Sequence, residues 1–333
     1  MKLIAIGRTD ILYDSIVKLA SSGHELVAII TSEAEQYQYT KRSSDFGKLA
    51  KDLSCEFIQT ENINNPIILE LIKDKEPDVA ISVNWKNIIP SDFINLFDYG
   101  ILNAHAGDLP KYRGNAVRNW AIITGEKKIA LTIHMMDSGL DSGKILMKEY
   151  YPIDFNTKIG HLYNFVGDRA PVLFDKVINN LSEGKSEPIT QDDSNLLRCY
   201  PRLPVDSQIN WNQTAEKIDR LVRASSEPFN GAYTFLSGEK LTIWESEVII
   251  EDYDYLASPG QVLNRSKDGV LVATGKDFLL IKDAEKVGKG RVPPYDIIPS
   301  IRLRLGMDYS AEILWLRKKL EELTSKIDLI LEK

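Results

Sequence analysis

The sequence predicts an α/β fold: a doubly wound, mostly parallel sheet, followed by a small β-barrel and a C-terminal helix. Three observations support this. Strands alternate with helices through the first half of the chain, five short strands follow in about fifty residues, and the tail has helical periodicity. The length of 333 residues suits two or three domains, and 43% apolar with 27% charged residues is an ordinary globular composition.

The first half predicts a parallel sheet covered by helices. Buried strands are predicted from apolar, often β-branched runs at residues 2–6, 26–31, 56–58 and 78–83. Helices are predicted between them, from apolar spacing at residues 11–20, 45–53 and 66–73. The first strand-to-helix turn, Gly7-Arg8-Thr9-Asp10, lacks the G-x-G-x-x-G pattern, which disfavours a dinucleotide there. Ligands of such sheets still bind beyond the carboxyl ends of the strands, where Val83–Pro90 leaves one strand.

The stretch from Gly100 to Gly143 holds the candidate chemistry. A strand starting at Gly100 delivers Asn103 and His105 to one face, because side chains alternate along a strand. A helix at 117–124 and a strand at 129–135 follow, and the glycine-bearing loop 137–143 brings a carboxylate back. An amide, an imidazole and a carboxylate are sufficient for acyl transfer.

Some roles within this stretch stay open from the residues alone. Asp137 and Asp141 are either paired carboxylates, or one of them caps the loop. His134, within an apolar strand, is predicted to be a packed or hydrogen-bonded neighbour of the site. Lys111, Arg113 and Arg118 form either a solvated basic face or a phosphate-binding group, and their place beside the site favours the second.

The second half predicts a barrel domain and a helix. A strand at 144–151, a helix at 158–181 and a turn-rich boundary at 188–204 precede a helix at 215–224. Five short strands suggest a small barrel, of which the OB-fold is one kind, at residues 232–236, 241–247, 260–264, 269–273 and 278–283. We therefore predict domains at 1–203 and 204–303, and a helix at 304–333.

The tail from Tyr309 to Lys333 has apolar residues in three- and four-residue steps, the a/d pattern of a coiled coil. These residues are Ile313, Leu316, Leu320, Leu323, Ile327 and Ile330. The pattern fits two arrangements equally: a helix packed on its own domain, or a helix that joins two copies in a homodimer.

Charge and cysteine usage limit the function classes. The net charge of −7 gives no general attraction to nucleic acid, although local patches can differ. Cys55 and Cys199 are far apart and lack metal-ligand spacing, so neither a disulfide framework nor a metal site is expected. No signal peptide and no membrane span are predicted. We expect a soluble cytoplasmic protein.

Two motifs resemble the signature of the folate-dependent formyltransferases. The first is Asn103-x-His105 with Leu109-Pro110-Lys111-Tyr112-Arg113-Gly114, and the second is Met136-Asp137-x-Gly139-Leu140-Asp141-x-Gly143. The resemblance continues through Ile209-Asn210-Trp211 and Pro228-Phe229-x-Gly231-Ala232 to about Ile301, and it leaves out the helical tail. In this part the chain is similar to two members, methionyl-tRNA formyltransferase and the enzyme that formylates UDP-4-amino-4-deoxy-arabinose.

The resemblance implies a Rossmann-like catalytic domain, N10-formyltetrahydrofolate as donor, no metal, and a primary amine as acceptor. It places Asn103, His105 and Asp141 on the catalytic positions. It also implies that two loops hold the pterin, largely through backbone groups. Their residues are Asn84, Trp85, Ile88, Ile89 and Pro90 in one loop, and Met136, Asp137, Gly139 and Leu140 in the other.

The acceptor is predicted from one loop and from charge. In the tRNA enzymes that this chain resembles, a basic, glycine-rich insertion follows the second strand. In this chain the corresponding stretch, Ser32–Arg42, begins with acidic residues and contains Tyr37 and Tyr39. Tyrosines suit stacking on a base or sugar. Lys111, Tyr112 and Arg113 complete the predicted acceptor site. We expect a nucleotide-linked amino sugar, used for surface polysaccharides such as lipopolysaccharide O-antigen, with initiator methionyl-tRNA as the alternative.

Overall fold

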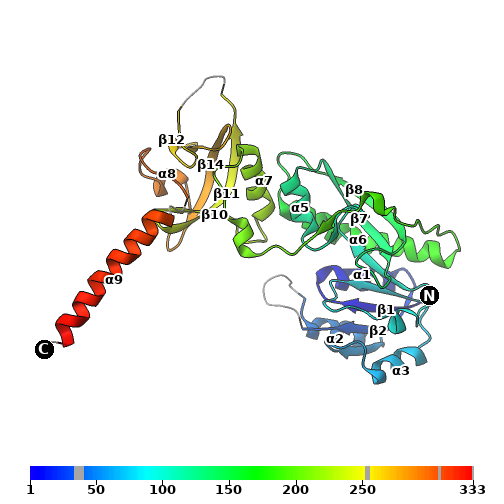
Figure 1. Cartoon of the computed structure of the whole chain (residues 1–333). Coiled ribbons are helices and arrows are strands. Elements are labelled where there is room, and N and C mark those ends of the chain that lie inside the picture. Colours follow the sequence, from blue (N-terminus) through cyan, green and yellow to red (C-terminus); the bar gives the residue numbers. More distant parts are fainter. Residues whose placement is uncertain (34–40, 252–255, 307–308, 332–333) are drawn as a thin grey trace. The chain divides into compact units, whose positions relative to one another are not determined.

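The computed structural model describes residues 1–33, 41–251, 256–306 and 309–331. Tyr37 and Tyr39 therefore lie outside the described residues. The chain forms two compact units, Met1–Arg202 and Leu203–Lys333, which are described one at a time (Figure 1). This division falls in the turn-rich stretch that the sequence predicts as a boundary.

Unit 1 is built on a seven-stranded sheet in the order β3-β2-β1-β4-β5-β7-β8. Its strands are β1 (Lys2–Gly7), β2 (Glu25–Thr31), β3 (Glu56–Gln59), β4 (Val79–Val83), β5 (Ile101–His105), β7 (Lys128–Met135) and β8 (Ile145–Pro152). In this spatial order the first five strands, β3, β2, β1, β4 and β5, pair in parallel. The strand β7 pairs antiparallel with both β5 and β8. The predicted doubly wound, mostly parallel sheet is confirmed.

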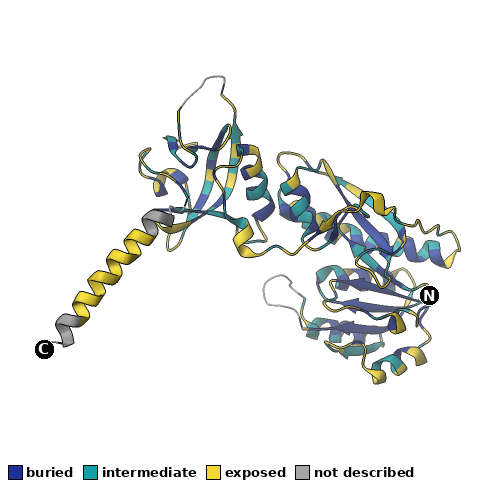
Figure 2. Cartoon of the chain, in the orientation of Figure 1, coloured by how far each residue is buried: buried dark blue, intermediate teal, exposed yellow. Residues whose placement is uncertain are grey.

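Helices cover both faces of this sheet because its strands are apolar on both sides. The helices are α1 (Asp10–Ser21), α2 (Ser43–Asp52), α3 (Pro66–Asp74), α4 (Ser91–Ile94), α5 (Val117–Thr124) and α6 (Ile159–Ser182). Along β1, Leu3 faces a cluster that includes residues of α1, α2 and α6, and Ile4 faces a second cluster with residues of α3 and α4. Figure 2 shows the buried strands between the more exposed helices.

The end of unit 1 is attached to the loops between β5 and α5. The strand β6 (Arg113–Gly114) pairs in parallel with β9 (Arg198–Cys199), and a short 3₁₀ helix, η1 (Asp193–Asn195), precedes β9. Sequence periodicity predicts only turns here, because strands of two residues leave no periodic signal.

Unit 2 is an antiparallel sheet in the order β10-β11-β14-β13-β12, with β15 added beside β14. Its elements are η2 (Pro204–Ser207), α7 (Ala215–Ser225), β10 (Ala232–Leu236), β11 (Glu239–Ile249), β12 (Val262–Ser266), β13 (Gly269–Ala273), β14 (Phe278–Lys286), β15 (Gly290–Val292) and α8 (Pro294–Ile297). Backbone hydrogen bonds join Leu305 to Gly260 and Gly306 to Phe235. The segment 303–306 thus bridges the two edge strands, as a barrel requires.

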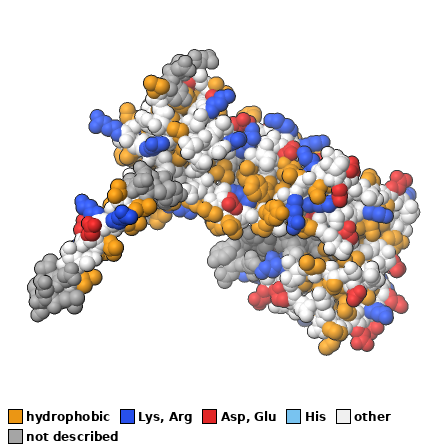
Figure 3. All heavy atoms as spheres, in the orientation of Figure 1, with side chains coloured by type: hydrophobic (Ala, Val, Ile, Leu, Met, Phe, Trp, Pro, Cys, Tyr) orange, Lys and Arg blue, Asp and Glu red, His pale blue; other side chains and the backbone are white. Residues whose placement is uncertain are grey.

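The last helix, α9 (Tyr309–Leu331), presents its described side chains to solvent. Residues 313–327 are all exposed, and Figure 3 shows hydrophobic side chains on the surface of this helix. None of the helices within the described ranges is long and apolar enough to span a membrane.

Both cysteines are free thiols that stay protonated at neutral pH. Burial raises the pKa of Cys55 to about 11, and it does the same for Cys199. Because the thiolate is the reactive form, both side chains are expected to react slowly.

Candidate active site

The strands β5 and β7 place four polar side chains on one face of the sheet. Asn103 lies directly opposite His134, and His105 lies opposite Thr132. The strand β5 runs through His105, so both Asn103 and His105 belong to it. Asn103 and His105 share one face, as the alternation along the strand predicts.

Asn103 and His134 form a hydrogen-bonded pair. His134 is 2% exposed, and its Nδ1 lies 2.8 Å from the Met135 carbonyl oxygen. The carbonyl can only accept, so Nδ1 carries the hydrogen in the neutral ring and Nε2 accepts from Asn103 Nδ2 at 3.1 Å. Burial above all, and then the neighbouring His105, lower the pKa of His134 to about 4. The neutral imidazole fixes which way the Asn103 amide faces.

His105 is buried between a carbonyl and a carboxylate. Its Nε2 lies 2.6 Å from the Tyr112 carbonyl oxygen, and its Nδ1 lies 3.5 Å from Asp141 Oδ2. Gly107 makes room for this arrangement, because a Cβ there would lie 2.6 Å from His105 Nε2 and from the Tyr112 oxygen. With both nitrogens facing acceptors, the ring is held at two points.

The structure separates the two carboxylates of the loop between β7 and β8. Asp141 Oδ2 accepts a hydrogen bond from the Gly114 amide at 2.8 Å, and its Oδ1 lies 3.7 Å from His134 Nε2. Asp137 instead accepts from the Gly139 amide and the Ser142 hydroxyl, at 2.9 and 2.7 Å. Asp141 therefore faces the histidines, whereas Asp137 caps its own loop.

The two predicted donor loops meet around one apolar cluster. Ile89 is buried in it, and the partly buried Trp85 and Met136 pack against it. Ile88 and Leu140, one from each loop, are 86% and 45% exposed. Asn84 has a φ of 53°, and Pro90 is the residue before α4. Uncovered apolar side chains beside a polar cluster fit a flat heteroaromatic ligand.

The predicted acceptor residues have different surroundings from one another. Lys111 is exposed, and its Nζ lies 3.4 Å from Glu126 Oε1. The Tyr112 side chain is buried, and its hydroxyl binds Glu126 at 2.8 Å. Arg113 is also buried, and it binds Gln191 and Asp193. Of the three, only Lys111 presents its side chain on an open surface.

Gln191 contacts the site and is absent from the sequence prediction. Its Nε2 donates to the carbonyl oxygens of Asp141 and Gly143. It lies in a stretch without periodicity, so no local signal distinguishes it from an ordinary turn residue.

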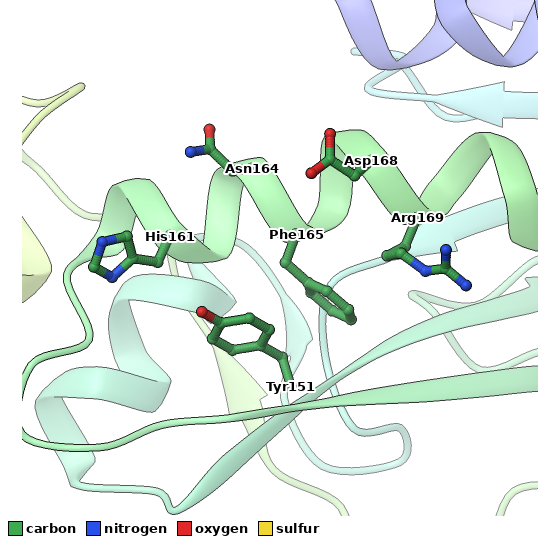
Figure 4. Close-up of a pocket in the computed structure, with 6 residues that line it drawn as sticks. All are labelled: Tyr151, His161, Asn164, Phe165, Asp168 and Arg169. Atoms are coloured by element: carbon green, nitrogen blue, oxygen red, sulfur yellow. The ribbon is translucent and has the colours of Figure 1, made fainter.

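A separate hollow of about 310 Å³ lies between α6 and β8 (Figure 4). The rings of Tyr151 and Phe165 are 5.0 Å apart there, and Figure 4 shows His161 and Arg169 to either side of them, whereas Asn164 and Asp168 point away from the rings. Tyr151 pairs with Ile129 in the sheet, and alternation places both on the face opposite His134. This hollow therefore lies across the sheet from the polar cluster. Among the described residues, no group of three or more His, Cys, Asp or Glu side chains could hold a metal ion.

The sequence matches two family patterns, one in each unit. The formyl transferase pattern matches residues 1–178, and the formyl transferase C-terminal domain pattern matches residues 204–302. The chain belongs to the formyltransferase family.

This formyltransferase resembles bacterial methionyl-tRNA formyltransferases along most of its length. It is 30% identical over 295 residues to the one from Caldanaerobacter subterraneus subsp. tengcongensis, which covers 88% of this chain and 94% of the relative. It is 39% identical over 217 residues to the one from Clostridium tetani, and the match covers 64% of this chain and 68% of that relative. The chain is therefore an enzyme that transfers formyl groups.

Two solved structures share its fold. WlaRD, a sugar 3N-formyltransferase determined with dTDP and 5-N-formyl-THF, has a TM-score of 0.66 and 21% identity, covering 87% of this chain and 98% of WlaRD. The N-formyltransferase from Helicobacter canadensis was determined with folinic acid and dTDP-3-aminofucose. It has a TM-score of 0.63 and 19% identity, and the match covers 85% of this chain and 98% of that one. At such identities the likeness shows the fold.

Proposed function

We propose that this formyltransferase moves a formyl group from N10-formyltetrahydrofolate to the primary amine of a nucleotide-linked amino sugar, as a cytoplasmic step toward surface polysaccharide. The group of Asn103, His105 and Asp141 beside the neutral His134 is the observation that supports formyl transfer. The solved relatives were determined with folates and dTDP compounds, which agrees with the proposed donor and acceptor classes.

Each of the three residues has a separate role in the proposed reaction. Asn103 Nδ2 gives one hydrogen to His134 and keeps the other for the formyl oxygen, on which negative charge develops as the amine attacks. Such an N–H donor is worth roughly 2.7–4 kcal/mol. His105 lies on the same face, where the Tyr112 carbonyl and Asp141 hold its ring. Asp141 orients His105 and takes the proton of the attacking amine through a water molecule. The bond between the formyl carbon and N10 then breaks, and the proton passes to N10 of the leaving tetrahydrofolate.

The donor site we propose lies between the loops 84–90 and 136–140. Trp85 Nε1 is buried without a hydrogen-bond partner among the described residues, and an absent ligand could provide an acceptor for it. Asn84, Ile88, Ile89, Pro90, Asp137, Gly139 and Leu140 would line the same site.

Charge supports a small acceptor over tRNA. Acidic residues outnumber basic ones in both units, and on the face drawn in Figure 3 the Lys and Arg side chains are scattered among acidic ones. A tRNA-binding enzyme draws most of its affinity from phosphate contacts with basic side chains. We propose Lys111, which is exposed in the loop between β5 and α5, as a cation that binds the acceptor, with Tyr37 and Tyr39 as stacking residues.

A panel of acceptors tests this proposal. Purified protein would receive N10-formyltetrahydrofolate with dTDP-, UDP- and GDP-linked amino sugars and, in parallel, initiator methionyl-tRNA. We expect formylation of at least one amino sugar, detected as a mass gain of one formyl group. Product from the tRNA alone would contradict the acceptor and support the function named for the sequence relatives.

Two histidine variants show whether the proposed residues carry the reaction. His105→Ala should lower kcat by about 100- to 1000-fold, because the imidazole that Asp141 orients beside Asn103 is lost. His161→Ala is the matched control: this exposed histidine lies on α6, across the sheet, and its loss should leave kcat unchanged. Equal kcat for all three proteins would exclude His105 as a catalytic group.

A second copy of the chain is the partner we propose for α9. Ile313, Leu320 and Ile327 occupy a positions and Leu316 and Leu323 occupy d positions, and each is at least half exposed. Isoleucine at a with leucine at d favours two parallel strands. These residues lie beyond the matched domain, which ends at 302.

A further inference from the structure

The segment 188–200 lies between the two matched family patterns, yet it is bonded to the catalytic loops along its length. Ile189 exchanges two backbone hydrogen bonds of 2.8 Å with Ile145, just after the Asp141 loop. The Arg113 amide donates to the Leu197 carbonyl, and Trp120 Nε1 donates to the Tyr200 carbonyl. This connecting segment is therefore a structural part of unit 1.

Gln191 is the side chain of this segment that reaches the catalytic loop. Its Nε2 donates to the Asp141 carbonyl oxygen at 2.8 Å and to the Gly143 carbonyl oxygen at 2.7 Å. Its Oε1 accepts from Arg113 Nε at 3.1 Å and from Arg113 NH2 at 2.7 Å. Both donors and both acceptor sites of the amide are used. Only an amide can face a guanidinium with one end and two carbonyls with the other.

Arg113 fixes the orientation of Gln191. The guanidinium is 8% exposed at the side chain, and its NH2 also binds Asp193 Oδ1 at 2.7 Å. A guanidinium only donates, so the Gln191 oxygen must face it and the nitrogen must face the loop. A continuous series of hydrogen bonds therefore joins Asp193, through Arg113 and Gln191, to the backbone of Asp141.

The Asp141 backbone needs such support. Its φ is 50°, a left-handed conformation that residues other than glycine rarely adopt unless their surroundings hold them. The Gly114 amide holds the carboxylate, whereas Gln191 holds the carbonyl of the same residue. Gly143 packs against Met135, since a Cβ there would lie 1.9 Å from the Met135 oxygen. The loop is thus restrained at three points around Asp141.

We propose that Gln191 is a positioning residue for formyl transfer, which holds Asp141 beside His105, and that Arg113 orients Gln191. The proposal rests on the formyltransferase activity of the chain. A misplacement of about 1 Å in a catalytic group can lower a rate about 100-fold. Loss of the two Gln191 donors would allow the Asp141 carboxylate to move away from the 3.5 Å contact with His105.

The variant Gln191→Glu tests the oxygen end and the nitrogen end of the amide separately. It keeps the oxygen that faces Arg113 and removes both hydrogen-bond donors to the loop. We expect kcat to fall about 10- to 100-fold while the KM for donor and acceptor stays within about threefold. Gln191→Ala should lower kcat at least as much. Asn195→Ala, which removes an exposed amide from the same segment, should leave kcat unchanged.

Amide hydrogen exchange of residues 137–145, followed by mass spectrometry, gives a readout that needs no turnover. Exchange should increase in Gln191→Glu and stay unchanged in Asn195→Ala. A kcat of Gln191→Glu within about twofold of the parent would overturn the proposal, as would unchanged exchange. If the parent formylates none of the acceptors tested, the proposed acceptor fails, and the exchange measurement still decides the role of Gln191.

Discussion

At the scale of single residues, the site depends on a histidine that stays neutral. His134 lies on the same face of the sheet as Asn103 and His105, donates to the Met135 carbonyl and accepts from Asn103. If His134 were protonated, Nε2 would become a donor and could no longer accept from the Asn103 amide. The burial that keeps this ring neutral therefore also fixes the orientation of the Asn103 amide.

The low pKa of His134 makes the stability of the protein depend on pH. The pKa is about 4 in the folded protein against an ordinary value of 6.5, so between these values only the unfolded chain binds the proton. The free energy of unfolding should therefore fall as the pH is lowered from 6.5 to 4, by about 3 kcal/mol at most from this group.

Urea unfolding at pH 7 and pH 4.5 measures this effect. The neutral variant His134→Gln removes the titrating group, so its stability should change less with pH than that of the parent. Carboxylates titrate in both proteins, and the difference between the two slopes isolates His134. Parallel slopes would show that His134 takes up its proton equally in the folded and unfolded states.

At the scale of elements, α9 carries an apolar stripe that its own unit leaves uncovered. Leu320 and Leu314 are 66% and 65% exposed, but only Leu320 lies on the a/d seam. Leu320→Glu places a charge in the proposed coiled coil, whereas Leu314→Glu places the same charge outside it. We expect the first change to halve the solution mass and the second to leave it unchanged.

Light scattering after size exclusion, at several protein concentrations, makes this comparison. Equal masses for the parent and both variants would mean that α9 does not join two copies. A parent that is monomeric at all concentrations would lead to the same conclusion.

At the scale of the whole molecule, the negative charge of both units bears on the choice of acceptor. The affinity of a tRNA-binding enzyme falls steeply as salt rises, because each phosphate contact releases counterions. We expect this chain to bind initiator methionyl-tRNA weakly at 150 mM salt, and to bind a nucleotide-linked amino sugar with a much smaller salt dependence. Tight tRNA binding that weakens steeply with salt would reverse the assignment.

Periodicity was enough to predict most of the fold. The order of strands and helices in the sheet follows from alternation of apolar runs, and the helix at Val117–Thr124 has the predicted bounds. The placement of Asn103 and His105 on one face follows from strand alternation alone. These features depend on residues that are close together along the chain, so a single sequence is enough to predict them.

The parts that the sequence does not predict depend on distant contacts. The strand β6 forms only because Arg113 and Gly114 meet residues 198 and 199, far along the chain. Tyr112 and Arg113 look like ligand-binding residues in sequence, but Glu126 and Gln191 turn them inward. The distinction between Asp137 and Asp141 likewise depends on Gly114, which approaches one carboxylate and not the other.

The two slow-reacting thiols offer a practical route to the geometry of α9. With the pKa of Cys55 and Cys199 at about 11, maleimide reagents at neutral pH should modify a newly introduced, exposed cysteine first. A spin label attached through Ser325→Cys would then report the separation of two α9 helices by pulsed dipolar spectroscopy. In a parallel pair the two labels lie at one level on the outer faces of the helices, whereas an antiparallel pair sets them apart along the helix axis.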